Sequence, residues 1–446
     1  MENYRQDIQN GHSPVHHARA YTTDVVSNPT PMRRPSHLRR DVNKFAKGLR
    51  HRLSTAHRVN KSIVSEISKE IRTAKAEADE FIQSPHLMFP PLKMTSILVL
   101  PLSVPLFFMP FKILVLYVFF FLGWYLTCLC YFATEVAMRP PWYKRGLSMV
   151  AVPPYWKGYV HDPKIDFGAD YENVEFVSTN GYILRGWVIG GRKENENWIV
   201  FVHGAGRDRR AFLRHSEAFV EKGYSVLLFD TSEHGLSDCS NNEGFQRGTS
   251  FGAREQYDVL GAVQFVKNRY RPRNIALIGT SAGASSAILA AANKECVVDA
   301  VVAENPFTSP DRLFQYHLSN LLENYLSKNQ HRTWRRLLFW CASRVLMLRI
   351  GQYFGSYGAI DAAPLLKCPL LVAHSKTDII VPFSHGMAIY EAAAKAKKMQ
   401  EGMVELYEVD DCVHCALFDK EPEEWGNRVF SFLERSFAQA QKTIAQ

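Results

Sequence analysis

Residues 275–292 read IALIGTSAGASSAILAAA, and every other motif in the chain is interpreted from this stretch. Its apolar first half is typical of a buried strand, and its Ala-rich second half is typical of a closely packed helix. Between the two halves lies Gly279-Thr280-Ser281-Ala282-Gly283, a G-x-S-x-G pattern. A nucleophilic serine on a sharp strand-to-helix turn needs small neighbours, because the backbone is strained and the helix must come close. The pattern alone arises by chance in about one chain in ten of this length, so its place between strand and helix carries the prediction that Ser281 is a nucleophile.

Strand and helix patterns alternate on both sides of this turn, from about residue 155 onward. This alternation predicts the α/β class, with a mostly parallel eight-stranded sheet and helices on both of its faces. The predicted strands are Val174–Ser178, Tyr182–Ile189, Trp198–His203, Ser225–Asp230, Asn274–Thr280, Val297–Ala303, Leu370–His374 and Val404–Val409. The predicted helices are Arg210–Lys222, Arg254–Asn268, Ala282–Asn293, His385–Lys398 and Pro422–Ala440. Residues 307–358, which are helical in pattern, basic and aromatic, predict an inserted cap.

A second glycine-rich loop precedes the serine turn in the sequence. The strand Trp198-Ile199-Val200-Phe201-Val202 runs into His203-Gly204-Ala205-Gly206. Acyl transfer needs backbone N–H donors directed at the oxyanion, and the N–H groups of Ala205 and Ala282 are the candidates. A dinucleotide-binding fingerprint is the rival interpretation of the two glycines, and it fails because Arg209 stands where the third glycine belongs.

A serine hydroxyl is a poor nucleophile unless a base and an orienting acid accompany it. Asp378 follows the predicted strand Leu370–His374, and His414 follows the last strand, 36 residues further along the chain. Side chains just beyond the carboxyl ends of parallel strands share one crevice, so Ser281, Asp378 and His414 form a candidate triad in the expected chain order. Glu304, just past another strand, is the alternative acid.

These motifs resemble those of the α/β-hydrolase superfamily over residues 173–440, about 60% of the chain. Within it, the chain is similar to serine-aminopeptidase-like, monoacylglycerol-lipase-like and membrane-anchored α/β-hydrolase-domain proteins. The match rests on the 203–206 loop, the 279–283 turn, Asp378 before Val381-Pro382, and His414. The turn Asp230-x-x-x-His234-Gly235-x-Ser237 also fits, although Ser232-Glu233 replaces the usual Arg-Gly pair. The resemblance implies a serine hydrolase of esters, thioesters or amides that uses no metal and no organic cofactor.

Cysteine use in the chain indicates reduced thiols, because eight cysteines in 446 residues are too few for a disulfide scaffold. Cys412-x-His414-Cys415 is the one tight cluster of possible metal ligands. Three ligands without a partner pair elsewhere match no closed zinc site, so a metal is not expected here.

The net charge of +9 is concentrated near the N-terminus, where residues 1–94 hold 16 Lys and Arg against 9 Asp and Glu. Residues 1–40 contain four prolines and few large apolar side chains, which predicts a disordered tail. Residues 41–94 predict a basic amphipathic helix, because apolar residues recur there at steps of three and four. Such a helix suits an anionic membrane surface, and equally a solvated helix that packs on its own domain or pairs with a copy of itself. Nucleic-acid binding is not expected, because the stretch carries no nucleic-acid-binding motif.

A membrane segment is predicted at residues 95–136. Ile113 to Ala133 is a run of 21 uncharged residues, long enough to cross a bilayer core of about 30 Å. Three prolines interrupt the apolar residues before it, so the segment is either one transmembrane helix or a re-entrant hairpin. A single span would place the basic helix and the C-terminal domain on opposite sides, whereas a hairpin would leave both on the cytoplasmic side. A buried helix pair of a soluble protein is the alternative.

The sequence therefore predicts a membrane-anchored serine hydrolase that cleaves ester or thioester bonds of lipid-like acyl substrates. Acylglycerols, lysophospholipids and S-acylated proteins are the expected classes, and the lipid membrane is the expected partner. We expect an integral membrane protein of the endomembrane (ER-like) system. A serine peptidase resembling aminopeptidases and a catalytically silent membrane scaffold are the alternatives, and the latter has no need to keep Ser281, Asp378 and His414 together.

Overall fold

The computed structural model describes residues 110–140, 142–143, 146–149, 152–191, 196–239, 248–323, 328–350, 357–396 and 403–445. The predicted tail (1–40), the predicted basic helix (41–94) and the first part of the predicted membrane segment (95–109) lie outside these residues.

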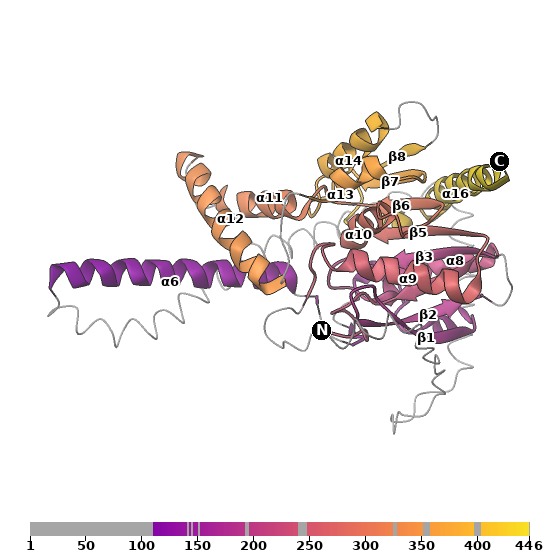
Figure 1. Cartoon of the computed structure of the whole chain (residues 1–446), viewed down its shortest axis with the longest axis horizontal. Coiled ribbons are helices and arrows are strands. Elements are labelled where there is room, and N and C mark those ends of the chain that lie inside the picture. Colours follow the sequence, from indigo (N-terminus) through magenta and orange to yellow (C-terminus); the bar gives the residue numbers. More distant parts are fainter. Residues whose placement is uncertain are drawn as a thin grey trace, which may run out of the picture. The chain divides into compact units, whose positions relative to one another are not determined.

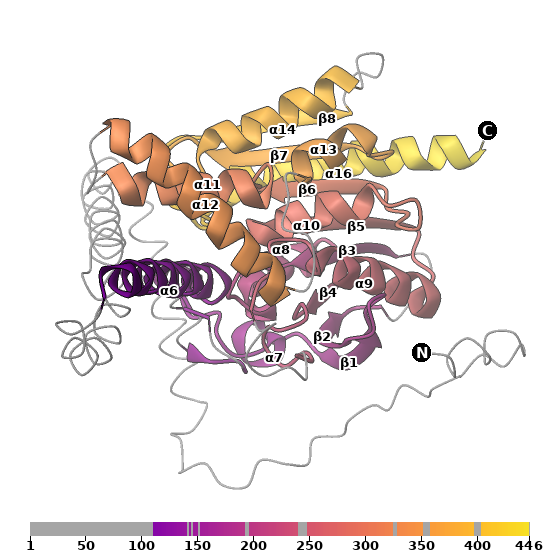
Figure 2. The same ribbon diagram turned by 60° about the vertical axis from the view of Figure 1, so that its left-hand side comes forward.

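An eight-stranded sheet forms the centre of the domain, as Figures 1 and 2 show. The strands follow the order β1-β2-β4-β3-β5-β6-β7-β8. Only the pairings of β1 with β2 and of β2 with β4 are antiparallel, and the other five are parallel. The strands are β1 (Tyr171–Val177), β2 (Ile183–Ile189), β3 (Asn197–Val202), β4 (Ser225–Phe229), β5 (Asn274–Thr280), β6 (Ala300–Glu304), β7 (Leu370–Ser375) and β8 (Val404–Val409). The predicted mostly parallel α/β sheet is confirmed.

Helices cover both faces of the sheet because its strands are apolar on both sides. In β3, Trp198 and Val200 point into one apolar core, and Ile199 and Phe201 point into another on the opposite face. The first core includes α9 (Glu255–Tyr270), α10 (Ala282–Ala291), α13 (Ala359–Ala362) and α14 (Phe383–Ala396). The second includes α8 (Leu213–Glu221) and α16 (Pro422–Ala445). The helices on the two faces can be followed in Figure 2.

Several element boundaries differ from those predicted, among them the starts of β6 and α8. The strand expected at Val297–Ala303 begins only at Ala300, and Val297 is exposed. The carboxylate of Asp299 instead accepts a hydrogen bond from the Ile275 N–H at 2.8 Å, just before the ladder starts. The helix expected from Arg210 opens as a 3₁₀ turn, Arg209–Phe212, before α8 begins at Leu213.

Three helices belong to the predicted membrane segment and the predicted cap. α6 (Phe111–Met138) contains Phe111–Glu135, which is long and apolar enough to cross a membrane, and few side chains there are buried. α11 (Pro310–Glu323) and α12 (Lys328–Ile350) lie within the segment predicted as a cap. Leu318 of α11, Cys130 of α6 and Leu338 of α12 share an apolar cluster. Arg349 of α12 forms an ion pair with Glu135 of α6 and donates to Thr134 Oγ1 at 3.0 Å.

Candidate active site

Ser281 occupies a strained turn between β5 and α10, with φ 55° and ψ −119°. The strain is tolerated because the neighbouring glycines let the chain come close. A Cβ on Gly283 would lie 2.1 Å from the Val202 carbonyl oxygen, and one on Gly279 would lie 2.5 Å from the Gly283 carbonyl oxygen. The Ser281 N–H donates to the Glu304 carbonyl oxygen at 2.8 Å, which ties the turn to the adjacent strand. The serine is therefore held in a fixed position at the carboxyl end of the sheet.

The structure brings the three residues of the predicted triad together. His414 Nε2 lies 2.9 Å from Ser281 Oγ, and His414 Nδ1 lies 2.6 Å from Asp378 Oδ2. Because a carboxylate only accepts, the Nδ1–H donates to Asp378, and neutral Nε2 is left to accept the serine proton. Residues separated by up to 133 positions in the sequence thus form one hydrogen-bonded chain.

Electrostatics couple the histidine to the aspartate. Burial by itself disfavours the His414 cation, but the Asp378 carboxylate outweighs burial and raises the His414 pKa well above 6.5. Burial also opposes the charge on Asp378, yet the attraction of His414 lowers the Asp378 pKa below its ordinary 3.8. Asp378 is therefore ionised at neutral pH and increases the basicity of the ring.

Asn305 and two backbone amides hold the Asp378 carboxylate. Asn305 Nδ2 donates to Oδ2 at 2.7 Å, and the Ile380 and Val381 N–H groups donate to Oδ1 at 2.8 and 2.9 Å. The sequence prediction did not include Asn305, which follows β6 with a φ of 48°. Asparagine tolerates this left-handed conformation better than most residues, so Asn at a strand end was the one available signal.

Ala205 and Ala282, the predicted oxyanion-binding residues, both lie beside the serine. They belong to one apolar cluster with Phe251, Phe307, Ile380, Val381 and Leu313 of α11. Ala282 opens α10, where helix N–H groups carry partial positive charge. The loop of Ala205 can approach the serine closely because Gly204 has no side chain. A Cβ on Gly204 would lie only 3.3 Å from Ser281 Cβ.

The alternative acid, Glu304, and the possible metal ligands can also be placed in the structure. The Glu304 carboxylate accepts a hydrogen bond from Trp425 Nε1 of α16 and not from His414. Burial outweighs this hydrogen bond and raises the Glu304 pKa to about 7. Among the residues that the structure describes, no group of three or more His, Cys, Asp or Glu is arranged to hold a metal ion.

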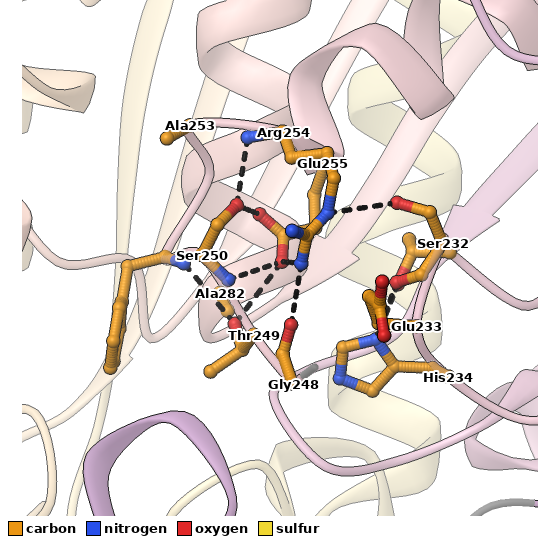
Figure 3. A network of polar contacts seen from close by, with 12 residues as sticks. Ser232, Glu233, His234, Gly248, Thr249, Ser250, Ala253, Arg254, Glu255 and Ala282 are labelled. Atoms are coloured by element: carbon orange, nitrogen blue, oxygen red, sulfur yellow. Dashed lines mark hydrogen bonds and ion pairs between the residues drawn. The ribbon is translucent and has the colours of Figure 1, made fainter. Parts of the chain in front are cut away.

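A buried polar network lies beside this site, and Figure 3 shows it. The Glu255 carboxylate accepts from the Ser250 and Gly252 N–H groups at 2.7 and 2.9 Å. Arg254 Nε donates to Ser232 Oγ at 3.2 Å. The network fixes the loop of Phe251, which lines the apolar cluster. It also shows how the Ser232-Glu233 pair is accommodated, with Glu233 buried at a φ of 70°.

The sheet order and the strand–serine–helix turn together define a class of protein. The chain has the α/β-hydrolase fold, in agreement with the resemblance of its motifs.

Comparisons with known proteins refine this assignment. Residues 193–346 match the family model described as serine aminopeptidase, S33. The chain is 27% identical over 276 residues to the uncharacterized protein YqkD of Bacillus subtilis (strain 168), covering 59% of this chain and 80% of that protein. It is 26% identical over 208 residues to the lysophosphatidylserine lipase ABHD12 of Danio rerio. That match covers 45% of this chain and about half, 48%, of the relative. An esterase structure from Pyrococcus furiosus aligns with a TM-score of 0.48 at 24% identity, covering 61% of this chain and 93% of the esterase.

Proposed function

We propose that this protein is a membrane-anchored serine hydrolase that cleaves ester or thioester bonds of lipid-like acyl substrates. One observation carries the proposal: the chain from Ser281 Oγ through His414 to Asp378, with separations of 2.9 and 2.6 Å. A serine hydroxyl within reach of a base that a carboxylate orients is the arrangement that acyl transfer requires.

In the proposed reaction, Ser281 Oγ attacks the acyl carbon while His414 Nε2 takes its proton. The N–H groups of Ala205 and Ala282 stabilise the negative oxygen of the tetrahedral intermediate. His414 then protonates the leaving alcohol or thiol, and an acyl-serine remains. Water, deprotonated by the same histidine, then attacks the acyl carbon of this ester. The bond from that carbon to Ser281 Oγ breaks, His414 returns the proton to Oγ, and the carboxylic acid is released. Throughout, Asp378 keeps the proton of the neutral ring on Nδ1 and stabilises the imidazolium.

Two features favour an apolar acyl chain as the part of the substrate beside the serine. Phe251, Phe307 and Leu313 belong to one apolar cluster with Ala282, next to the serine. Burying a methylene group of an acyl chain contributes about 0.8 kcal/mol. The relative from Danio rerio, described as a lysophosphatidylserine lipase, supports a lipid ester. Acylglycerols, lysophospholipids and S-acylated proteins remain the proposed classes.

The membrane anchor proposed here is α6. Within α6, the 21 uncharged residues from Ile113 to Ala133 would span a bilayer core of about 30 Å. Its exposed side chains include Leu116, Phe119 and Phe120, which water would hydrate poorly and lipid would solvate well. We propose an integral membrane protein of the endomembrane (ER-like) system on this basis. Separation of the full-length protein into membrane and soluble fractions, before and after carbonate extraction, tests the anchor.

A peptidase is the second candidate, because the matching family model is described as serine aminopeptidase. An aminopeptidase must bind the positively charged amine of its substrate beside the serine. Phe251, Phe307 and Leu313 instead place apolar side chains in the cluster of Ala282, and these suit an acyl chain. A panel of acyl esters and aminoacyl amides would distinguish the two activities.

A fluorophosphonate probe tests the proposed function directly. Membranes that contain the wild-type protein should be labelled, and membranes with Ser281→Ala should not. Tyr159→Phe is a suitable control. The Tyr159 hydroxyl donates a hydrogen bond to Glu217 and to no residue of the triad, so its removal should leave labelling of Ser281 unchanged. A folded wild-type protein that resists labelling, or an equally labelled Ser281→Ala variant, would refute the assignment of Ser281.

A further inference from the structure

The oxyanion loop, Gly204–Gly206, packs closely against Ser281 on one side and Trp142 on the other. On one side, a Cβ on Gly204 would lie 3.3 Å from Ser281 Cβ. On the other side, a Cβ on Gly206 would lie 2.8 Å from both Cδ1 and Nε1 of the Trp142 indole. The loop is therefore packed between the nucleophile and Trp142.

Hydrogen bonds fix both ends of one peptide unit in this loop. Trp142 Nε1 donates to the Ala205 carbonyl oxygen at 3.0 Å. The Gly206 N–H, at the other end of the same planar unit, donates to His234 Nε2 at 3.2 Å. Clamping this plane restricts the dihedral angles of Ala205. The direction of the Ala205 N–H, the proposed oxyanion donor, depends on those angles.

The chain before and after Trp142 is anchored to the loops around the site. Trp142 belongs to a post-helix segment, defined here as Met138, Pro140, Trp142, Tyr143 and Gly146. The Met138 carbonyl oxygen accepts from the Thr249 N–H at 2.9 Å, and the Gly146 N–H donates to the Gly235 carbonyl oxygen at 3.0 Å. The Tyr143 ring meets the His234 ring edge-to-face at 5.4 Å, and its hydroxyl donates to the Glu233 carbonyl oxygen. The segment is thus rigidly docked on the loops around the site.

We infer that Trp142 is a positioning residue of the oxyanion hole, so that the post-helix segment is part of the catalytic apparatus. The inference rests on the proposed function. α6 ends at Met138, four residues before Trp142, so the proposed anchor and the oxyanion loop are joined by a short connection. A truncated catalytic domain that begins after Trp142 would lack the indole donor as well as the anchor. Its activity would fall for a reason unrelated to membrane binding.

Trp142→Phe in the full-length protein tests the inference, because it removes the N–H donor and keeps an aromatic ring. Trp187→Phe is the matched control. Trp187 also donates from Nε1, at 3.1 Å to Asn173 Oδ1, but it lies on β2 away from the triad. It is buried, whereas Trp142 is half-buried, so the control is the more demanding substitution for the fold. Both variants and the wild type are titrated with a fluorophosphonate, so that kcat for a p-nitrophenyl acyl ester is expressed per reactive serine. A variant that folds only in part therefore still yields its constants.

For Trp142→Phe we expect kcat per titrated serine to fall at least about tenfold while KM stays within twofold. Outright removal of an oxyanion donor costs a factor of about 10² to 10³, and a misdirected donor costs less. The Ki of a trifluoromethyl ketone, which forms a tetrahedral oxyanion on the serine, should rise by the same factor as kcat falls. A purely structural role would lower the fraction of titrated enzyme and leave kcat and Ki unchanged.

The outcomes separate the two hypotheses. If the wild type is active and Trp142→Phe has the kcat and Ki of Trp187→Phe, the inference is wrong and the proposed function stands. If the wild type neither reacts with the probe nor hydrolyses the ester, the proposed function fails and the inference fails with it.

Discussion

Replacing Asp378 with asparagine should leave the fold intact and move the proton of the neutral His414 ring from Nδ1 to Nε2. The carboxylate accepts from two backbone N–H groups through Oδ1 and from Asn305 and His414 through Oδ2. An asparagine can place only one oxygen among these four donors. If that oxygen faced His414, the asparagine NH₂ would face the backbone N–H groups of Ile380 and Val381. These N–H groups are donors in every state, so they would have no acceptor. Two buried donors without acceptors would cost about 2–6 kcal/mol at 1–3 kcal/mol each.

The opposite orientation avoids this cost. The asparagine oxygen then faces the two backbone N–H groups, and its NH₂ faces Asn305 and His414. Asn305 accommodates the change by turning its amide, because its Oδ1 has no hydrogen-bond partner among the described residues. His414 must accept at Nδ1, which moves its proton to Nε2, the atom that faces Ser281. The ring then cannot take the serine proton.

We therefore expect Asp378→Asn to lower kcat about 10⁴-fold, the loss typical of a histidine held in the wrong tautomer. This corresponds to about 5.4 kcal/mol in activation free energy. The assay is kcat for a p-nitrophenyl acyl ester with the enzyme concentration taken from total folded protein, as judged by circular dichroism. Glu304→Gln is the matched control, since it makes the same isosteric change at the alternative acid and should keep kcat within about threefold. A folded Asp378→Asn variant that retains more than a few per cent of kcat, or a Glu304→Gln variant that loses as much, would refute the assignment of the orienting acid.

Three further predictions follow from the same geometry. Because Asp378 raises the His414 pKa well above 6.5 and the reaction needs the neutral ring, kcat/KM should fall with decreasing pH around a midpoint above 6.5; a midpoint at or below 6.5 in a pH–rate profile would contradict this. Gly283→Ala should abolish probe labelling and lower the unfolding temperature, because its Cβ would lie 2.1 Å from backbone; Gly426→Ala, whose Cβ would lie 3.5 Å from the Phe430 ring, should do neither, and equal behaviour would disprove the steric argument. Burial raises the Glu304 pKa from 4.5 to about 7, so the folded state binds this proton more tightly than the unfolded state, and the resulting stability, about 3 kcal/mol, is lost as pH rises through about 7. The unfolding temperature of Glu304→Gln minus that of the wild type should therefore be larger at pH 8 than at pH 5. An equal difference at the two pH values would rule this out.

Local patterns predicted most of the fold. Each of the eight strands overlaps the run that predicted it. The central strands are buried on both faces and need continuous apolar sequence, whereas the edge strands β1 and β8 alternate apolar and polar residues. The turn at Ser281 was predictable for a similar reason, since the close approach of Val202 to Gly283 admits no side chain. The start of β6 was placed wrongly because Val297 has strand propensity but no partner strand. Propensity describes a residue, and pairing depends on its neighbours in space.

The sequence by itself determined the α/β class, the serine turn and the candidates for the triad, because each depends on residue type at a strand end. Only the tertiary structure decided between Asp378 and Glu304, since both follow parallel strands and differ in what their side chains meet: His414 for one, Trp425 for the other. Only the tertiary structure revealed Asn305 and Trp142, whose hydrogen-bond partners lie 73 and 63 residues away in the sequence. Such contacts are formed by strand order and chain packing, and no local pattern of residues encodes them.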